Sequence, residues 1–377
     1  MKISCSLFVT LIILSCVKNC KGLCKNVENE VNCESVSEIS RELISQIPNI
    51  KEVTRLHVKF NTELEIYPRS FESASKLQYL VINHNKINKI SSDTFQDIPL
   101  KYLHLGYNNI NAIYPAAFFN LSFLQELRFE NNNLKEIPIG VFTNLPIKEL
   151  ALSKNKIHTI ENSALENLPN LKKLLLDGNN LQSIYLQELL THPKSLEILW
   201  LHNNSLTAVT NYMLRGLKNL RILNLAMNSI TFVESNSFKQ TPKLSYLILS
   251  HNHLRQINGN VFPKGETSSL QNLYIDNNRL MFLPFNFFVR LGKLKNIVMV
   301  GNPWYCSCLT IVQMLLAENS ITEKCNEEYS NGKKPVCVSG SVGQDYCVHF
   351  YNDDLSEKYE TYKKTLPLPK RPLLCSF

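Results

Sequence analysis

The 377-residue sequence predicts an α/β fold, a solenoid of about eleven tandem repeats whose short parallel strands stack into one sheet. The first supporting observation is a periodic asparagine that recurs every 23 to 26 residues, at Asn61, Asn85, Asn108, Asn132, Asn155, Asn179, Asn204, Asn228, Asn252, Asn278 and Asn302. The second is a large apolar residue ten positions after each of the first ten asparagines, at Phe71, Phe95, Phe118, Phe142, Leu165, Leu189, Leu214, Phe238, Phe262 and Phe288. Because the apolar residue keeps a constant offset of ten positions from the asparagine, the chain consists of tandem repeats.

A single repeat shows why stacking is expected. The segment 124–146 has the leucine-rich pattern L-x-x-L-x-L-x-x-N-x-L, with apolar positions at Leu124, Leu127, Phe129, Leu134, Ile137 and Phe142. The L-x-L alternation makes a short strand with one apolar face, which one repeat alone cannot bury. Each asparagine amide can satisfy backbone groups of the adjacent turn. These features predict a leucine-rich repeat solenoid (horseshoe) with a concave parallel sheet, and the Phe/Leu column on the opposite wall.

The chain begins with an expected signal peptide over residues 1–22. Lys2 precedes the apolar run SLFVTLIILSCV, which ends near the small residues of a cleavage site. A membrane anchor is the alternative, but the run is shorter than the ~20 residues of a spanning helix, and no other segment is a candidate span. The remaining segments predict an N-terminal cysteine cap at 23–52, repeats at 53–305, a C-terminal cysteine cap at 306–350 and an extended tail at 351–377.

The cysteines lie only outside the repeats. Removal of residues 1–22 leaves an even set, Cys24, Cys33, Cys306, Cys308, Cys325, Cys337, Cys347 and Cys375, whereas an earlier cut retains Cys20 and leaves an odd number. The ends of a solenoid expose apolar layers, and disulfide-stapled caps protect such ends in exported proteins. We therefore expect disulfides, with Cys24 paired to Cys33. A zinc site at Cys306 and Cys308 is the less favoured alternative.

The segment Asn302–Cys308 reads N-P-W-x-C-x-C, which resembles the C-terminal cap of extracellular leucine-rich repeat proteins. The phenylalanine-bearing repeats are similar to the typical subclass found in Toll-receptor ectodomains, Slit-type proteins, small matrix proteoglycans and soluble insect immune proteins. The resemblance covers Cys24 to about Cys347. It implies that Cys306 and Cys308 each pair with a later cysteine, but four later cysteines are available, so the partners stay unassigned. It also implies a helix over 309–319 that faces the last repeat through Ile311, Met314, Leu315 and Leu316.

The tail 351–377 departs from these relatives. It is charged and then contains Pro367, Pro369 and Pro372, so we expect an extended arm. Cys375 has two interpretations: it closes the even set of cap cysteines, or it forms a disulfide with a partner chain.

The sequence predicts no enzyme, no cofactor and no metal site. It lacks G-x-S-x-G, H-E-x-x-H and a phosphate-binding glycine loop, and the pair His251 and His253 has no expected carboxylate partner. The net charge of +8 falls to +5 without Lys2, Lys18 and Lys21, and the charges are scattered. Nucleic-acid binding is therefore not expected. Two sequons predict glycosylation at Asn120, on the outer wall, and at Asn203, at the rim of the sheet.

The outward positions of the strands predict a ligand-binding surface. In the sixth to tenth repeats these positions, with one turn residue, are apolar: Leu175, Ile198, Trp200, Ile222, Met227, Tyr246, Ile248 and Tyr274. Side chains in two adjacent columns on strands ~4.8 Å apart form a contiguous patch, and such patches mark interaction sites. Two alternatives are isolated strand-forming residues and a tail that folds back over them. A second, smaller group comprises Tyr79, Tyr102, His104 and Tyr107.

Three functional classes are compatible with this surface. The favoured class is a secreted recognition protein that binds a protein or glycoconjugate ligand through its concave face, in innate immunity. The second is a matrix or adhesion component, which the mild charge and the lack of a Ser-Gly glycosaminoglycan-type N-terminal stretch disfavour. The third is a secreted inhibitor that wraps a target enzyme. The sequence does not identify the ligand.

Overall fold

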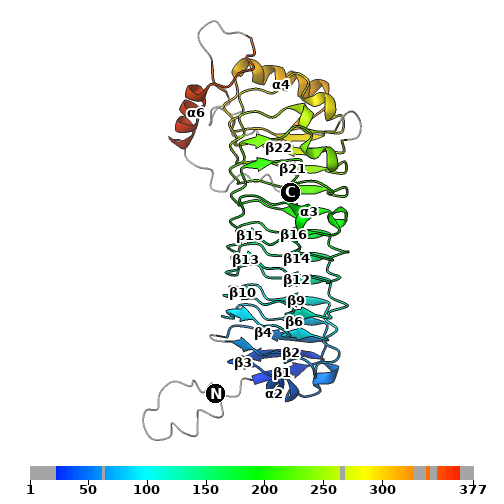
Figure 1. Cartoon of the computed structure of the whole chain (residues 1–377). Helices are drawn as coiled ribbons and strands as arrows, with labels where there is room; N and C mark the ends of the chain where they lie inside the picture. Colours follow the sequence, from blue (N-terminus) through cyan, green and yellow to red (C-terminus); the bar gives the residue numbers. More distant parts are fainter. Residues whose placement is uncertain (1–22, 62–63, 264–267, 326–336, 340–345, 366–377) are drawn as a thin grey trace. The chain divides into compact units, whose positions relative to one another are not determined.

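The computed structural model describes residues 23–61, 64–263, 268–325, 337–339 and 346–365. The chain divides into two compact units, residues 1–123 and 124–377. In each unit, short strands follow one another in chain order along a sheet (Figure 1).

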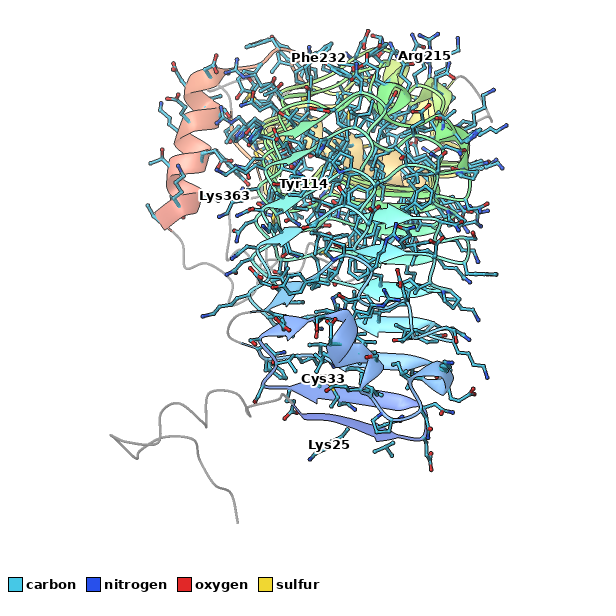
Figure 2. The ribbon with its side chains drawn as sticks, turned by 60° about the horizontal axis from the view of Figure 1, so that its bottom comes forward. Lys25, Cys33, Tyr114, Arg215, Phe232 and Lys363 are labelled. Carbon is cyan, nitrogen blue, oxygen red and sulfur yellow. A yellow bond between two sulfur atoms is a disulfide. The ribbon has the colours of Figure 1, made fainter. Side chains whose placement is uncertain are left out.

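The first unit begins with an antiparallel hairpin and continues as a parallel sheet. Its strands are β1 Leu23–Val27, β2 Glu30–Glu34, β4 Arg55–Val58, β6 Tyr79–Val81 and β9 Tyr102–His104. Cys24 and Cys33 face each other across the hairpin and form a disulfide, as expected (Figure 2). The hairpin joins the repeats because β2 pairs in parallel with β4. The N-terminal cap is therefore a strand pair that covers the first apolar layer.

Shorter elements complete the first unit. The helix α2 (Arg41–Ser45) begins at Ser40, whose Oγ accepts a hydrogen bond from the Leu43 amide at 3.3 Å, a side-chain N-cap. The other elements are η1 Ile50–Glu52, β3 Glu38–Ile39, β5 Glu65–Ile66, β7 Lys89–Ile90, β8 Phe95–Gln96, β10 Ala112–Ile113 and β11 Phe118–Phe119. The last six strands pair two by two, in parallel, outside the main sheet.

The second unit contains a longer run of parallel strands. These are β12 Glu126–Arg128, β14 Glu149–Ala151, β16 Lys173–Leu175, β17 Ile198–Trp200, β19 Ile222–Asn224, β21 Tyr246–Ile248, β22 Asn272–Tyr274, β23 Asn296–Val298 and β24 Thr322–Glu323. From β12 to β23 the central residue of each strand is fully buried. Its two neighbours point to the opposite face, as the period of two requires.

The wall behind this sheet is built from short strands and helical turns. They are β13 Glu136–Ile137, β15 Thr159–Ile160, β18 Ala208–Val209, β20 Phe232–Val233, α3 Leu186–Leu189, η2 Pro193–Ser195, η3 Ser237–Gln240, η4 Gly259–Val261 and η6 Phe288–Arg290. The Phe/Leu column is buried along this wall, and Phe238 stacks on Phe262 with 5.4 Å between ring centroids. The repeat therefore has the strand wall and the Phe/Leu wall that its period predicts.

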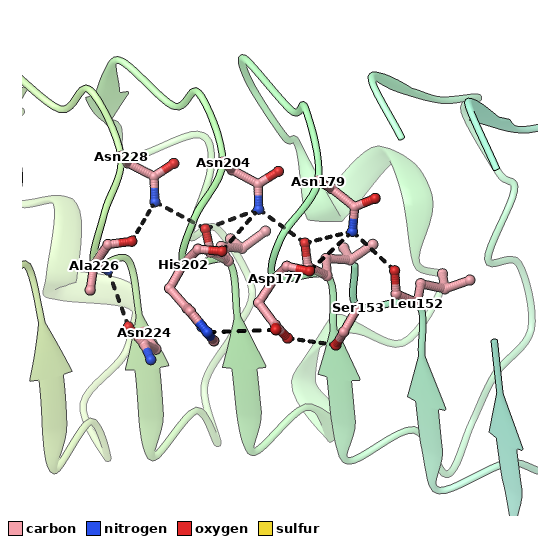
Figure 3. A network of polar contacts seen from close by, with 11 residues as sticks. Leu152, Ser153, Asp177, Asn179, His202, Asn204, Asn224, Ala226 and Asn228 are labelled. Carbon is pink, nitrogen blue, oxygen red and sulfur yellow. Dashed lines mark hydrogen bonds and ion pairs between the residues drawn. The ribbon is translucent and has the colours of Figure 1, made fainter. Parts of the chain in front are cut away.

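The periodic asparagines bond successive repeats together (Figure 3). Asn228 Nδ2 donates to the carbonyl of Leu201 in the preceding repeat at 3.0 Å and to that of Leu225 in its own repeat at 3.0 Å. Its Oδ1 accepts from the Leu206 amide at 3.0 Å. Met227, just before it, has a positive φ of 54°, as the tight turn requires. The predicted structural role of the asparagines is thus confirmed.

The C-terminal cap contains two disulfides whose pairing the sequence did not determine. Cys306 pairs with Cys337 and Cys308 with Cys347, and Cys325 is also disulfide-bonded. Trp304 is buried beside them and donates its Nε1 hydrogen to the Met299 carbonyl at 2.9 Å. A zinc site at Cys306 and Cys308 is therefore excluded, because both sulfurs are bonded. Cys375 lies outside the described residues, as does the expected signal peptide.

The cap helix differs in detail from the expected one. Helix α4 spans Cys306–Glu318 and buries Cys308, Leu309, Val312 and Leu316. The expectation that Met314 faces the last repeat is wrong, because this side chain is 59% exposed. The reason is helical periodicity: the buried residues Cys308, Val312 and Leu316 recur every four positions on one side of the helix, and Met314, two residues after Val312, lies on the opposite side.

The expectation of an extended tail is wrong for residues 353–365, which form helix α6 (Asp353–Thr365). The Asn352 side chain caps the helix, since its Oδ1 accepts from the Leu355 amide at 3.0 Å. Asp353 and Asp354 in the first turn, and lysines in the last, complement the helix dipole. The prolines that suggested an arm begin only at Pro367, and residues 366–377 lie outside the described part of the chain. None of the described helices is long and apolar enough to cross a membrane.

Candidate functional site

The outward face of the second unit's sheet contains two columns of side chains in strict register. The first strand position aligns Lys173, Ile198, Ile222, Tyr246 and Asn272. The third position aligns Leu175, Trp200, Asn224, Ile248 and Tyr274. The strand residues predicted to bind a ligand therefore share one face. The polar residues Asn224 and Asn272 interrupt the apolar columns.

An accessible apolar area occupies the middle of this face. We name it the sheet patch; it consists of Leu175, Ile198, Trp200, Ile222, Met227 and Tyr246. Trp200 is the most open member, with 38% of its surface exposed, while the others are half-buried. The Trp200 ring meets the His202 ring edge-on at 5.8 Å, which orients the indole. The patch spans four adjacent strands, β16 to β21.

A network of ion pairs borders the sheet patch on the β12 side. Arg128 Nη2 lies 2.6 Å from Glu149 Oε1, and Lys173 Nζ lies 3.2 Å from Glu149 Oε2. Arg128 also approaches Glu126 at 3.5 Å and Glu130 at 3.9 Å. Glu149 is almost fully buried, so these cations neutralise a desolvated carboxylate. This end of the face is therefore internally paired and not an open charged site.

A polar row continues the face beyond the sheet patch (Figure 3). Ser153 Oγ donates to Asp177 Oδ1 at 2.6 Å, and His202 Nε2 lies 3.5 Å from Asp177 Oδ2. Burial lowers the pKa of His202, although the carboxylate of Asp177 raises it in part. Ser, Asp and His occur here, but the serine bonds the aspartate and not the histidine. The arrangement lacks the nucleophile–base contact of a hydrolase triad.

The far end of the face is buried, contrary to its predicted role in ligand binding. Ile248 is only 2% exposed and Tyr274 only 8%. They pack with Ala226, Val298 and Val300, and Met227 and Tyr246 contact the edge of this group. Burial also raises the pKa of the Tyr274 hydroxyl. Ile248 and Tyr274 are therefore parts of a covered cluster in this structure, whereas the sheet patch remains accessible.

A second polar row lies beside the covered cluster, and sequence reasoning missed it. Ser250 Oγ donates to Asp276 Oδ1 at 2.5 Å, and Asn277 Nδ2 donates to Asp276 Oδ2 at 2.8 Å. Burial raises the pKa of Asp276, while burial lowers the pKa of the neighbouring His251. Ser250 and Asp276 occupy the same repeat position as Ser153 and Asp177, two residues before the periodic asparagine of adjacent repeats. That recurrence was the signal available in the sequence. Within the described ranges, no cluster of His, Cys, Asp and Glu could hold a metal ion.

The smaller aromatic group of the first unit falls into two parts. Tyr79 and Tyr102 are neighbours on the sheet, 6.4 Å apart, and Tyr102 meets His104 edge-on at 6.1 Å. Tyr107 lies instead at the turn, where it stacks on His84 at 4.5 Å. The group therefore combines residues of the strand columns with a residue of the turn.

Both predicted glycosylation sites are exposed in the structure. Asn120 lies on the wall behind the first unit's sheet, where its Nδ2 donates to Asp97 Oδ1 at 2.6 Å. Asn203 lies at the turn just after Trp200 and has a positive φ of 54°. A glycan on Asn203 would therefore border the sheet patch.

Comparisons with known proteins agree on the fold. A family model described as "Leucine rich repeat" matches residues 51–100, 122–181 and 194–254. No curated protein sequence matches the chain. Among solved structures, the leucine-rich repeat domain of APL1B has a TM-score of 0.61 at 21% identity and covers 89% of this chain and 99% of that chain.

Two further structures contain protein complexes. The mouse RP105/MD-1 complex matches with a TM-score of 0.58 at 20% identity and covers 78% of this chain. The Drosophila Toll–Spatzle complex matches with a TM-score of 0.52 at 19% identity and covers 73%. This chain spans only 45% and 44% of the matched chains of those complexes. At these identities the likeness establishes the fold alone.

Proposed function

Because this chain is a leucine-rich repeat protein, we propose that it is a secreted, non-catalytic recognition protein that binds a protein ligand on the sheet patch. The observation that carries this proposal is the accessible apolar area on four in-register strands, with Trp200 at its centre. A contiguous apolar surface is costly to leave in water unless a ligand covers it. Trp and Tyr are also the residue types that dominate interface energies.

The composition of the sheet patch favours a protein ligand over a sugar. Leu175 on the adjacent strand and the Ile198–Ile222 pair in the neighbouring column add aliphatic surface beside Trp200, which complements apolar side chains better than hydroxyl groups. The Glu149 carboxylate beside the patch is already paired, so the ligand needs no cation there. Toll and RP105 are both solved in complexes with proteins, Spatzle and MD-1 respectively, which supports the same ligand class for this fold.

Innate defence is the process in which we place this recognition. The Toll–Spatzle complex is described as a molecular hub in Drosophila development and innate immunity, which supports this placement. For this chain the proposal is tested by exposing the producing tissue to microbial challenge and measuring the level of the secreted protein, which should rise. A matrix component or a constitutive enzyme inhibitor would keep a constant level.

Site-directed photo-crosslinking tests the binding surface. Tyr246 is replaced by the photoreactive residue p-benzoylphenylalanine, and the protein is irradiated in the extracellular fluid of the producing organism. Phe232, an exposed aromatic residue on the wall behind the sheet, receives the same replacement as a control. We expect one captured protein at position 246 that is absent at position 232 and is competed away by the unmodified chain. The captured protein is then purified as a defined ligand.

Binding of that purified ligand gives the decisive measurement. The double variant Trp200→Ser, Ile222→Ser should weaken binding by roughly 30-fold or more, since loss of a central anchor costs about 2 kcal/mol or more. Phe232→Ser should leave the affinity unchanged. Both variants should keep the thermal unfolding midpoint of the parent, because none of these side chains fills the core. Unchanged affinity in the double variant would place the binding site elsewhere. The captured protein's identity also separates a recognition role from enzyme inhibition or matrix binding.

A further inference from the structure

A small cavity opens on the wall behind the second unit's sheet. Strand β15 and helix α3 border it from two adjacent repeats (Figure 1). Its volume is about 250 Å³, and its lining includes Thr159, Tyr185 and Glu188. Pockets for drug-sized ligands measure ~300–1,000 Å³, so this cavity suits a smaller group. None of the lining residues belongs to the sheet patch.

Helix α3 presents Glu188 as the anionic group of this cavity. The helix buries Leu186 and Leu189, so Glu188 faces outward and stays half-exposed. Its backbone is fixed on both sides, because the Glu188 amide donates to the Tyr185 carbonyl at 2.9 Å and its carbonyl accepts from the Ser163 amide at 2.8 Å. The fold therefore holds the backbone that carries this carboxylate in place before a ligand arrives.

The Glu188 carboxylate has a neutral hydrogen-bond partner and no cationic one. Tyr212 Oη donates to Glu188 Oε1 at 2.6 Å, whereas no described lysine, arginine or histidine lies within ion-pair distance of this carboxylate. Other acidic residues of the same unit differ, since Glu149 and Glu197 contact cations at 2.6 and 2.9 Å. The described part of the chain thus leaves the negative charge of the cavity unpaired.

Two tyrosine rings lie beside this charge. Tyr185 lines the cavity, and its ring centroid lies 5.2 Å from that of Tyr212, with the two planes inclined at 59°. The residues are 41% and 40% exposed, so both rings are accessible to a ligand. An aromatic face attracts a cation that lies within about 6 Å of the ring centroid, and aromatic cages bind quaternary ammonium groups in this way. An inclined ring pair beside an unpaired carboxylate offers the same chemistry.

We propose that this cavity binds a trimethylammonium group of the kind that choline carries. The rings of Tyr185 and Tyr212 contact the methyl groups, and Glu188 balances the charge. A primary ammonium such as that of lysine is strongly hydrated, and a cavity with one carboxylate replaces little of that hydration. The site goes beyond the proposed function, because it gives the protein a second ligand on a surface that shares no residue with the sheet patch.

Saturation-transfer NMR with choline chloride tests the site in the full chain. Transfer from the protein to the trimethyl protons is followed as choline is added, and sodium chloride keeps the ionic strength constant. We expect saturable binding that is about tenfold tighter than binding of neohexanol, the uncharged carbon isostere of choline. Equal binding of the two probes, or no saturable binding of choline, overturns the proposal.

Variants of the cavity locate the bound ammonium. Tyr185→Leu and Glu188→Gln should each weaken choline binding about fivefold or more, and Gln keeps the shape of the Glu188 side chain while it removes the charge. The matched control is Tyr67→Leu in the first unit, because Tyr67 is also an exposed tyrosine that donates to a carboxylate, Glu65 Oε2, at 3.2 Å. This control should leave the affinity unchanged. Unchanged affinity in both cavity variants, with parental thermal midpoints, overturns the proposal.

Phosphatidylcholine vesicles distinguish a membrane head group from a free compound once choline binding is saturable. Sedimentation of the parent chain with these vesicles, lost in Tyr185→Leu, assigns lipid head groups to the site. Choline binding without sedimentation assigns a free ammonium compound. Both results support the ammonium site, whereas sedimentation together with unchanged choline affinity in Tyr185→Leu overturns it.

Discussion

Each periodic asparagine hydrogen-bonds to backbone groups of its own repeat and of the preceding repeat, so its replacement should destabilise both repeats. Asn228→Ala removes three buried hydrogen bonds to carbonyl oxygens, at 3.0 to 3.2 Å, and leaves the Leu206 amide without its acceptor. We expect a loss of about 3 kcal/mol in the free energy of unfolding, because each unsatisfied buried group costs roughly 1–3 kcal/mol. Urea denaturation measures it. Asn170→Ala, at an exposed asparagine, should stay within about 0.5 kcal/mol of the parent; equal losses in the two variants would contradict a special role of the ladder.

His202 makes the stability of the second unit depend on pH. Burial lowers the pKa of His202 below its ordinary value of 6.5, so the folded protein binds this proton more weakly than the unfolded chain does. Stability should therefore fall as the pH drops below about 6.5 toward the folded-state pKa. His202→Gln should flatten this loss between about pH 7.5 and pH 5. Thermal unfolding at several pH values measures the difference, and an identical pH dependence in the variant would refute the role of His202.

At the scale of elements, helix α6 shows how a charged sequence is held on a repeat edge. Asp353 Oδ1 lies 2.9 Å from Arg255 Nη2, and the Arg255 guanidinium lies 4.7 Å from the centre of the Tyr351 ring. Tyr359 is buried on the inner side of the helix. Apolar packing therefore stabilises the docked helix, while the Arg255 contacts set its position along the repeats.

Arg255→Ala should loosen helix α6 without unfolding the repeats. Both ionic partners are exposed, so the salt bridge and the ring contact contribute about 1 kcal/mol each at most. We expect faster amide hydrogen exchange in residues 353–365 and a nearly unchanged thermal midpoint. Arg215→Ala, at an exposed arginine on the wall behind the sheet, is the control (Figure 2). Exchange rates in α6 that match the parent would show that Arg255 does not hold the helix.

In the molecule as a whole, the repeats bury apolar surface against one another and the caps bury it at the two ends. Each repeat buries its apolar face only against a neighbour, so the ends require different chemistry. The Cys24–Cys33 hairpin and the disulfides Cys306–Cys337 and Cys308–Cys347 supply it. Such bonds persist in oxidising compartments, which supports the proposal of a secreted protein.

Secretion through that route predicts N-glycans on the exposed residues Asn120 and Asn203. Glycosidase treatment of the secreted protein should lower its mass in two increments. Asn120→Gln and Asn203→Gln should each remove one increment, because the two sequons lie in different repeats and are modified independently. A mass that glycosidase leaves unchanged would contradict both sites. A glycan on Asn203 should also restrict ligand approach at the edge of the sheet patch.

The repeat, the strand register and the existence of both caps follow from the amino-acid sequence alone. These properties follow from the local period: one apolar face per strand, one asparagine per turn, and the same contacts between every pair of neighbours. The period alone therefore places Trp200, Ile222 and Tyr246 on one face. The Asn228 ladder is predicted for the same reason, whereas the Cys24–Cys33 pair is predicted because these cysteines lie before the first repeat, at an exposed end of the solenoid.

The accessibility of the outward residues and the pairing of the C-terminal cysteines could be read only from the folded chain. Trp200 and Tyr274 have equivalent positions in the repeat, yet Trp200 is open and Tyr274 is buried. The pairing of Cys306 with Cys337 depends on a Cα–Cα separation of 5.0 Å, which only the folded cap produces. Burial and pairing depend on segments distant along the chain, such as α6 and the loop at Cys325. A repeat period carries no information about where such non-repeating segments dock.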